Sequence, residues 1–174
     1  VNTKLVFLFV GGDPVRKGFV KVIKALEKSR INNKAILLAV GFDPNKYSLP
    51  SATNTKIKFT GKVDDEMLLK LYQISDFLIL PSYYDPFGLV VLEAMATETI
   101  PIISNTVGAS EIVANGIEGF VFKNDDELIE ILNSLTTLDI DTMRSKAKAK
   151  AMQFSWLNIA RKLIEIIRKD IKRT

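Results

Sequence analysis

The sequence predicts an α/β protein built on a parallel sheet with crossover helices. Apolar runs of strand length alternate with segments whose apolar residues recur at helical spacing, from one end of the 174 residues to the other. The first run, "KLVFLFV" (4–10), is apolar without interruption after its lysine, as expected for a strand that is buried on both faces. With 47% hydrophobic and 25% charged residues, the chain 1–174 has the composition of a single globular domain with a sizeable core.

The expected elements follow in order along the chain. Strands are expected where short apolar runs are bounded by turn residues: 4–10, 34–41, 56–61, 76–82, 100–104 and 119–122. Helices are expected where apolar residues recur three or four positions apart: 16–29, 64–75, a segment that begins near 86, 110–116, 125–135, 141–153 and 156–173. Asp64 is expected to cap the second of these helices, because it precedes an acidic first turn. Tyr72 and Trp156 fall at helical spacing with other apolar residues, which predicts that both belong to the core.

The composition excludes several kinds of chemistry. Lysine and arginine exceed aspartate and glutamate by 24 to 20, and the resulting net charge of +4 is too small to argue for nucleic acid. The chain has no Cys, which excludes disulfides and thiolate metal sites, and no His, the commonest general base. No apolar run approaches the roughly 20 residues of a membrane span, and no signal peptide precedes the first strand. We therefore expect a cytoplasmic protein with no metal site.

The last expected helix has a basic face and an apolar face. The basic residues are Arg161, Lys162, Arg168, Lys169, Lys172 and Arg173, and the apolar ones opposite them are Ile159, Leu163, Ile166 and Ile167. The more usual role of such a basic face is a solvated surface with cations placed favourably near the helix C-terminus. The other interpretation is a peripheral contact with an anionic membrane surface, at the inner face of the membrane.

The loop after the first strand, "VGGDPVRKGF" (10–19), has features of an anion site. Ligands of open parallel sheets bind beyond the carboxyl ends of the strands, in loops of this kind. Arg16 and Lys17 stand at the expected start of a helix, where cations are unfavourable by a few tenths to about 1 kcal/mol unless an anion is present. Gly12 lets a ligand approach the backbone, and Gly18 removes a side chain beside the two cations. The spacing is not that of a dinucleotide or P-loop motif, and a surface turn with two solvated bases is the alternative.

The stretch "DPFGLVVLEAMA" (85–96) places two carboxylates around the start of a helix. Asp85 followed by Pro86 has the pattern of a helix N-cap with proline at the first helical position. Glu93 has no such explanation, because apolar residues flank it on both sides and an unpaired buried carboxylate is unfavourable by several kcal/mol or more. Its partner must be either a protein group or a ligand.

One kind of ligand would use both of these loops. An anion on the free amides of residues 87–90 could extend a ribose diol towards Glu93, whose carboxylate can accept from both hydroxyls. Arg16 and Lys17 would then bind a diphosphate, and Asp85 would face the group beyond the second phosphate. This is the geometry of a nucleotide sugar.

The same residues resemble a known family. The stretch "DPFGLVVLEAMATETIPII", with Asp85 and Glu93 eight positions apart, is similar to the acidic-x7-Glu motif of the retaining GT-B glycosyltransferases of family 4. That group includes many mannosyltransferases and the relatives of sucrose and glycogen synthases. Four further segments occur in the order of the family's C-terminal domain: "FVGGDPVRKGF", "IKFTGKVDDEMLLKLYQISDFLILPS", "SNTVGASEIVANGIEGFVF" and "FSWLNIARKL". The resemblance implies a Rossmann-like parallel sheet with helices on both faces, the C-terminal half of a GT-B fold, without the N-terminal domain that binds the acceptor.

The resemblance also implies roles for residues. In such enzymes the basic pair of the first loop binds the donor diphosphate, which here implies Arg16 and Lys17. The second acid of the motif binds the ribose and the first contacts the sugar, which implies Glu93 and Asp85. The full implied donor site is Gly12, Arg16, Lys17, Gly41, Lys62, Val63, Asp85, Phe87, Gly88, Leu89, Val90 and Glu93. In this site the amides of Leu89 and Val90 would hold the distal phosphate, and Gly41 and Lys62–Val63 would flank the base.

The implied activity is transfer of a hexose, of mannosyl or glucosyl type, from a UDP or GDP sugar to a sugar, lipid or glycan acceptor, without a metal or other cofactor. Arg16, Lys17 and the helix amides would stabilise the leaving phosphate in place of a metal, with Asp85 and Glu93 completing the catalytic group. The chain alone is expected to be inactive. A sugar-nucleotide epimerase of the same fold and a non-catalytic nucleotide-binding module stay open as alternatives. This sequence departs from the family pattern in having Asp rather than Glu at position 85, and "TETIP" (97–101) where a small residue or Gly commonly precedes the strand.

Overall fold

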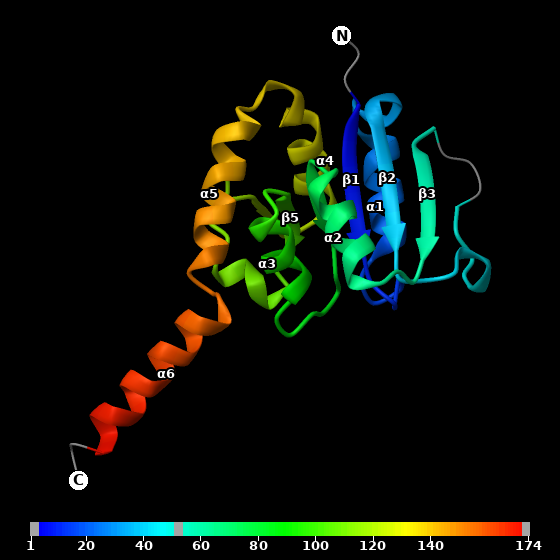
Figure 1. Ribbon diagram of the computed structural model, residues 1–174. Helices are drawn as coiled ribbons and strands as arrows, with labels where there is room; N and C mark the ends of the chain where they lie inside the picture. Colours follow the sequence, from blue (N-terminus) through cyan, green and yellow to red (C-terminus); the bar gives the residue numbers. More distant parts are fainter. Residues whose placement is uncertain (1–3, 51–53, 172–174) are drawn as a thin grey trace.

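The sheet has the expected parallel architecture. The computed structural model describes residues 4–50 and 54–171, and within them six strands form one parallel sheet in the order β3-β2-β1-β4-β5-β6 (Figure 1). The strands are β1 Leu5–Val10, β2 Ala35–Val40, β3 Lys56–Gly61, β4 Phe77–Leu80, β5 Ile100–Ser104 and β6 Phe120–Phe122. This is the strand order of a Rossmann fold, so the predicted α/β class is confirmed.

Helices connect the strands and cover both faces of the sheet. They are α1 Phe19–Lys28, α2 Asp65–Gln73, α3 Leu89–Ala96, α4 Asp125–Ser134, α5 Ile140–Met152 and α6 Trp156–Ile171. The crossover through α1 leads outward from β1 to β2, whereas the crossover through α3 leads outward from β4 to β5 in the opposite direction. Because such crossovers are right-handed, the two helices lie on opposite faces of the sheet. Helix α4 packs against α1, and α5 packs against α3.

The core lies at the centre of the sheet. The side chains of β4 are fully buried, as are Phe7, Leu8 and Phe9 of β1. Phe7 and Phe77 stack across these two strands with ring centroids 5.4 Å apart. β1 and β4 are neighbours at the centre of the sheet. The chain leads from β1 to β2 on one side of this pair and from β4 to β5 on the other side. Loops that follow β1 and β4 border the crevice where the strand order reverses, which is the usual ligand site of such sheets.

Helix α1 and the helix expected at 110–116 differ from the expectation, whereas the start of α2 agrees with it. α1 begins at Phe19 rather than at residue 16, because Gly18 has φ 74° and ends a turn in which the Phe19 amide donates to the Pro14 carbonyl. Arg16 and Lys17 therefore precede the helix and are not in its first turn. The helix expected at 110–116 is wrong, because the structure has only a short 3₁₀ turn, Gly108–Glu111, and then irregular chain. The predicted cap of α2 is confirmed, since Asp64 accepts from the Met67 amide at 2.8 Å.

Helix α6 extends away from the sheet (Figure 1). Trp156 is 79% exposed, so its assignment to the core is wrong. Helical spacing predicts that an apolar face exists, but it does not identify what covers that face. The exposed apolar residues of α6 are Trp156, Leu157, Ile159, Leu163, Ile164, Ile166 and Ile167. Its cations at 161, 162, 168 and 169 are exposed too, whereas Lys172 and Arg173 lie outside the described residues. No helix in the described part of the chain combines the length and apolarity needed to cross a bilayer.

Candidate functional site

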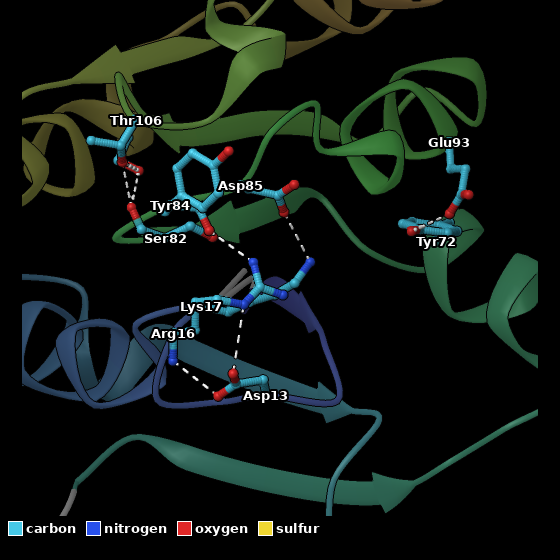
Figure 2. Close-up of polar contacts among 10 residues, drawn as sticks. Asp13, Arg16, Lys17, Tyr72, Ser82, Tyr84, Asp85, Glu93 and Thr106 are labelled. Carbon is cyan, nitrogen blue, oxygen red and sulfur yellow. Dashed lines mark hydrogen bonds and ion pairs between the residues drawn. The ribbon is translucent and has the colours of Figure 1, made fainter.

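Two loops are joined at the crevice, as Figure 2 shows. The loop after β1 contributes Arg16, whose carbonyl accepts from the Tyr83 amide at 2.9 Å. The Arg16 guanidinium donates through Nη1 to the Tyr84 carbonyl at 2.8 Å. Beside it, Lys17 Nζ lies 3.2 Å from Asp85 Oδ2. The structure thus brings together Arg16, Lys17 and Asp85, which the sequence placed in one site although they are nearly 70 positions apart.

A glycine makes the contact between Lys17 and Asp85 possible. A Cβ atom on Gly11 would lie 2.4 Å from Cδ of Lys17, so the aliphatic part of the lysine crosses the backbone at Gly11. The lysine and the aspartate are each only 12% exposed. A charge pair this shielded interacts more strongly than one at the open surface. Sequence reasoning read the glycines of this loop as room for a ligand and missed that Gly11 makes room for Lys17.

Arg16 has a different environment from Lys17. Its amide donates to Asp13 Oδ1 at 3.0 Å, and its Nε lies 3.5 Å from Asp13 Oδ2. The Arg16 side chain is 43% exposed, so it has room to move towards a ligand. Asp13 was not among the predicted site residues. Its signal in the sequence is an acid three positions before the basic residue, in a turn that also contains proline.

The carboxylate of Asp85 does not cap a helix, so the predicted N-cap is wrong. Helix α3 begins at Leu89 after Gly88, which has φ 78° and, being glycine, caps nothing with a side chain. The backbone of Asp85 instead pairs with the following loop, since its amide donates to the Thr106 carbonyl and its carbonyl accepts from Gly108. A Cβ on Gly88 would lie 2.6 Å from Val107 Cγ1 of that loop. Asp85 is therefore directed towards Lys17.

The backbone amides of Leu89 and Val90, in the first turn of α3, are available to an acceptor from outside the helix. No side chain caps this helix, and the amides of Leu89 and Val90 belong to the turn that has no partner within a helix. The side chains of Phe87 and Leu89 are 44% and 54% exposed, so this end of the helix is open to solvent. An anion that binds here would also gain from the positive end of the helix dipole.

Glu93 lies in the second turn of α3, and the expectation that it is buried is wrong. The residue is exposed although its sequence neighbours are apolar, because those neighbours point to the core from other sides of the helix. The hydroxyl of Tyr72 donates to Glu93 Oε2 at 2.8 Å (Figure 2). Tyr72 is 3% exposed, which confirms that it belongs to the core. Sequence reasoning missed its contact with Glu93, because the two residues are 21 positions apart in different helices.

The expected base-binding residues surround a hollow at the carboxyl ends of β1, β2 and β3. This hollow of about 280 Å³ is lined by Gly12, Gly41, Phe42, Asp43, Lys46, Tyr47, Gly61 and Lys62. Gly41 has φ 106°, and its amide donates to the Gly61 carbonyl at 2.8 Å, which links β2 to β3 at this point. Val63 does not line the hollow, because its side chain packs against the core. Among residues 4–50 and 54–171, no three His, Cys or carboxylate side chains cluster closely enough to hold a metal ion.

Comparison with known proteins identifies the family of this chain. The family model described as "Glycosyl transferases group 1" matches residues 1–153. The chain is 31% identical over 170 residues to an uncharacterized glycosyltransferase of Methanocaldococcus jannaschii, an alignment that covers 91% of this chain and 43% of that protein. It is 30% identical over 189 residues to the glycogen synthase of Thermodesulfovibrio yellowstonii, covering 97% of this chain and 36% of that one.

Solved structures give the same result for the fold. Anabaena Alr3699/HepE in complex with UDP matches with a TM-score of 0.78 at 26% identity, over 97% of this chain and 49% of that one. The lipopolysaccharide outer core galactosyltransferase WaaB matches with a TM-score of 0.83 at 17% identity, over 97% of this chain and 50% of that one. The chain therefore spans less than half the length of these curated relatives and about half the length of these solved chains. It belongs to the glycosyl transferases group 1 family and has the Rossmann-like fold of the C-terminal half of a GT-B glycosyltransferase.

Proposed function

We propose that this chain is the donor-binding domain of a retaining glycosyltransferase. It would take a hexose of mannosyl or glucosyl type from a UDP or GDP sugar and deliver it to an acceptor. The observation that supports this most directly is the contact between Lys17 and Asp85, because it places a cation suited to a phosphate beside an acid suited to a sugar, next to the uncapped start of α3. The relatives support the substrate class, since they include glycogen synthases and Anabaena Alr3699/HepE, which was crystallised in complex with UDP-glucose.

The proposed roles follow from charge and position. Lys17, Arg16 and the amides of Leu89 and Val90 bind the diphosphate. When the bond between the sugar and the phosphate breaks, its electron pair stays on the phosphate oxygen, and these groups stabilise that charge without a metal. Retention is explained by attack of the acceptor hydroxyl on the face from which the phosphate leaves, with the hydroxyl proton passing to the departing phosphate oxygen. Asp85 contacts the sugar.

The remaining residues bind the nucleoside. Glu93 accepts hydrogen bonds from the two ribose hydroxyls, and the base occupies the hollow at Gly12, Gly41 and Lys62. Gly88 and Phe87 complete the wall between the phosphate and the sugar. A carboxylate can accept from two vicinal hydroxyls at once, which neither an amide nor a single hydroxyl does as well.

We propose that the acceptor, which is a sugar, a lipid or a glycan, is bound by an N-terminal domain outside this chain, and that the enzyme works in the cytoplasm. The exposed apolar and cationic faces of α6 suit a contact at the inner face of an anionic membrane. Co-sedimentation with vesicles that do or do not contain anionic lipid tests that contact. Binding that does not depend on the anionic lipid would contradict it.

Titration calorimetry of the 174-residue chain tests the donor assignment. We expect UDP or GDP to bind, the corresponding nucleotide sugar to bind more tightly because Asp85 contacts the sugar, and the nucleoside monophosphate to bind more weakly because it lacks the distal phosphate. A chain that binds neither diphosphate would overturn the proposal. A non-catalytic nucleotide-binding module would bind UDP and UDP-glucose equally, and an epimerase would convert UDP-glucose to an isomer without any acceptor.

A further inference from the structure

A buried phenol faces the carboxylate at the proposed ribose site. Tyr72, in α2, donates its hydroxyl to Glu93 Oε2 in α3 at 2.8 Å, and only 3% of Tyr72 is exposed. Its backbone is fixed as well, because the Tyr72 carbonyl accepts from Thr99 Oγ1 at 2.7 Å and Thr99 is fully buried. The tyrosine is therefore held by packing and by hydrogen bonds, whereas Glu93 is a long side chain on an exposed helix face.

Tyr72 is a hydrogen-bond donor over the whole useful pH range. Burial raises the pKa of its phenol well above the ordinary value, and the negative charge of Glu93 and the hydrogen bond between them raise that pKa further. The phenol thus keeps its proton, and Glu93 must supply the acceptor. An ionised carboxylate has about four acceptor positions on its two oxygens, so one bond to Tyr72 leaves capacity for two hydroxyl donors.

The pair borders an open cavity. A hollow of about 390 Å³ between α2 and α3 is lined by Asp65, Leu68, Leu69, Tyr72, Glu93, Ala96 and Thr97. Glu93 also borders a second hollow of about 500 Å³ on the other flank of α3, towards α5 and α6. The Glu93 side chain thus lies between two hollows, with free space on both sides of it. Figure 2 shows its carboxylate turned towards Tyr72. Without that contact, the side chain would have two directions in which to turn.

We propose that Tyr72 is a positioning residue, which holds the Glu93 carboxylate in the orientation that receives the ribose diol. This inference rests on the proposed function, in which Glu93 binds the ribose. Ordering a long side chain before the ligand arrives removes that entropy loss from the binding step. The competing explanation is that the bond serves only stability, since a buried hydroxyl requires some acceptor.

The test measures the preference for a diol, not affinity alone. The probes are UDP and its 2′,3′-dideoxy analogue, titrated into the 174-residue chain. In the unmodified chain UDP should bind more tightly than the analogue, and Glu93→Gln should remove most of this preference. Tyr72→Phe keeps the ring and deletes only the hydroxyl, so we expect it to weaken UDP by about 3- to 10-fold, the size expected when one long side chain must be ordered on binding. It should leave affinity for the dideoxy analogue unchanged.

A matched control separates positioning from packing. Thr99→Val deletes the other hydroxyl that fixes Tyr72 but leaves the contact with Glu93 in place. It should lower the melting temperature at least as much as Tyr72→Phe does and leave the diol preference intact. Tyr72→Phe in the Glu93→Gln background should have no further effect on the preference, because both changes act through the same carboxylate.

The ribose contact of Glu93 and the positioning role of Tyr72 can be tested separately. If Glu93→Gln keeps the full diol preference, the ribose assignment of the proposed function is wrong and this inference is wrong with it. If Glu93→Gln removes the preference while Tyr72→Phe keeps it, only the positioning role is wrong. Equal changes in preference from Tyr72→Phe and Thr99→Val would also overturn that role, because packing alone would then explain them.

Discussion

Lys17 Nζ lies 3.2 Å from Asp85 Oδ2, and the two side chains are equally shielded from solvent. The pair joins the loops after β1 and β4, at the crevice where the strand order reverses. The residue proposed to bind the diphosphate is thus paired with the residue proposed to face the sugar. A bound diphosphate would compete with Asp85 for the same ammonium group, so changes at either residue should have effects that depend on the ligand.

The first prediction separates the two carboxylates. Asp85→Asn should leave affinity for UDP unchanged or raise it, because Lys17 loses a competing partner, and it should weaken binding of the nucleotide sugar. Glu93→Gln should weaken both ligands equally, by about 1 to 3 kcal/mol for a hydrogen bond to a charged group. Calorimetry with UDP and UDP-glucose measures this. Equal losses for both ligands in Asp85→Asn would refute a contact between Asp85 and the sugar.

The second prediction concerns the glycine beneath the lysine. Gly11→Ala should displace the Lys17 side chain, because the new Cβ would lie 2.4 Å from Lys17 Cδ. We expect UDP to bind up to about tenfold more weakly, as after loss of one charge-assisted hydrogen bond. In a Lys17→Ala background the same change should have little further effect. Gly12→Ala is the control for the effect of an added methyl group on melting temperature. Its Cβ would meet only the Gly41 carbonyl, at an ordinary 3.7 Å.

The third prediction concerns metal and turnover. Nucleotide binding should be the same with EDTA as with Mg²⁺ or Mn²⁺, because Arg16, Lys17 and the helix amides provide the positive charge. The chain alone should transfer no sugar to any acceptor, since the acceptor site is proposed to lie elsewhere. Calorimetry and a radiolabelled transfer assay check the two parts. An absolute requirement for a divalent cation would require a different mechanism.

The fourth prediction concerns backbone conformation after α3. Glu98 has φ 66°, in the left-handed region that residues other than glycine rarely adopt, and it follows the end of α3. Its carboxylate pairs with Lys148 Nζ at 2.8 Å. Glu98→Gly and Glu98→Ala both remove that pair, so their difference reports the backbone alone. The glycine variant should melt about 2–4 °C above the alanine variant. Equal melting temperatures would mean that the turn relaxes without strain.

Much of the fold could be predicted from the sequence. Local periodicity locates the strands and every α-helix of the described residues, because buried strands and amphipathic helices impose their own spacing, and it adds one helix, at 110–116, that does not form. The residues at which the helices begin were harder to predict. α1 and α3 begin after Gly18 and Gly88, which have a left-handed backbone and lie against residues distant in sequence, Pro81 and Val107. The expected helix at 110–116 failed because its few apolar residues fit a turn equally well.

The sequence indicated which residues lie at the candidate site better than it indicated which residues they contact. Residue types indicated which loops carry charge, but the partner of each charge depends on the strand order, which sequence periodicity does not define. Asp85 looked like a helix cap because the local pattern fits one, and its actual partner is Lys17, 68 positions earlier. Glu93 looked buried because its neighbours in sequence are apolar, whereas exposure depends on which side of the helix a residue lies.

The central position of β1 has a consequence for synthesis. β1 pairs with β2 on one side, Leu5 with Ala35, and with β4 on the other, Phe7 with Phe77. The ribosome adds the 36 residues between Val40 and Phe77 in roughly 2–7 s at about 5–20 residues per second. Throughout that interval one edge of β1 carries unpaired backbone groups beside wholly apolar side chains, which is a template for incorrect pairing. The nascent chain therefore carries this open edge while β3 and α2 are being made, and a chaperone that shields the edge during that interval would limit aggregation.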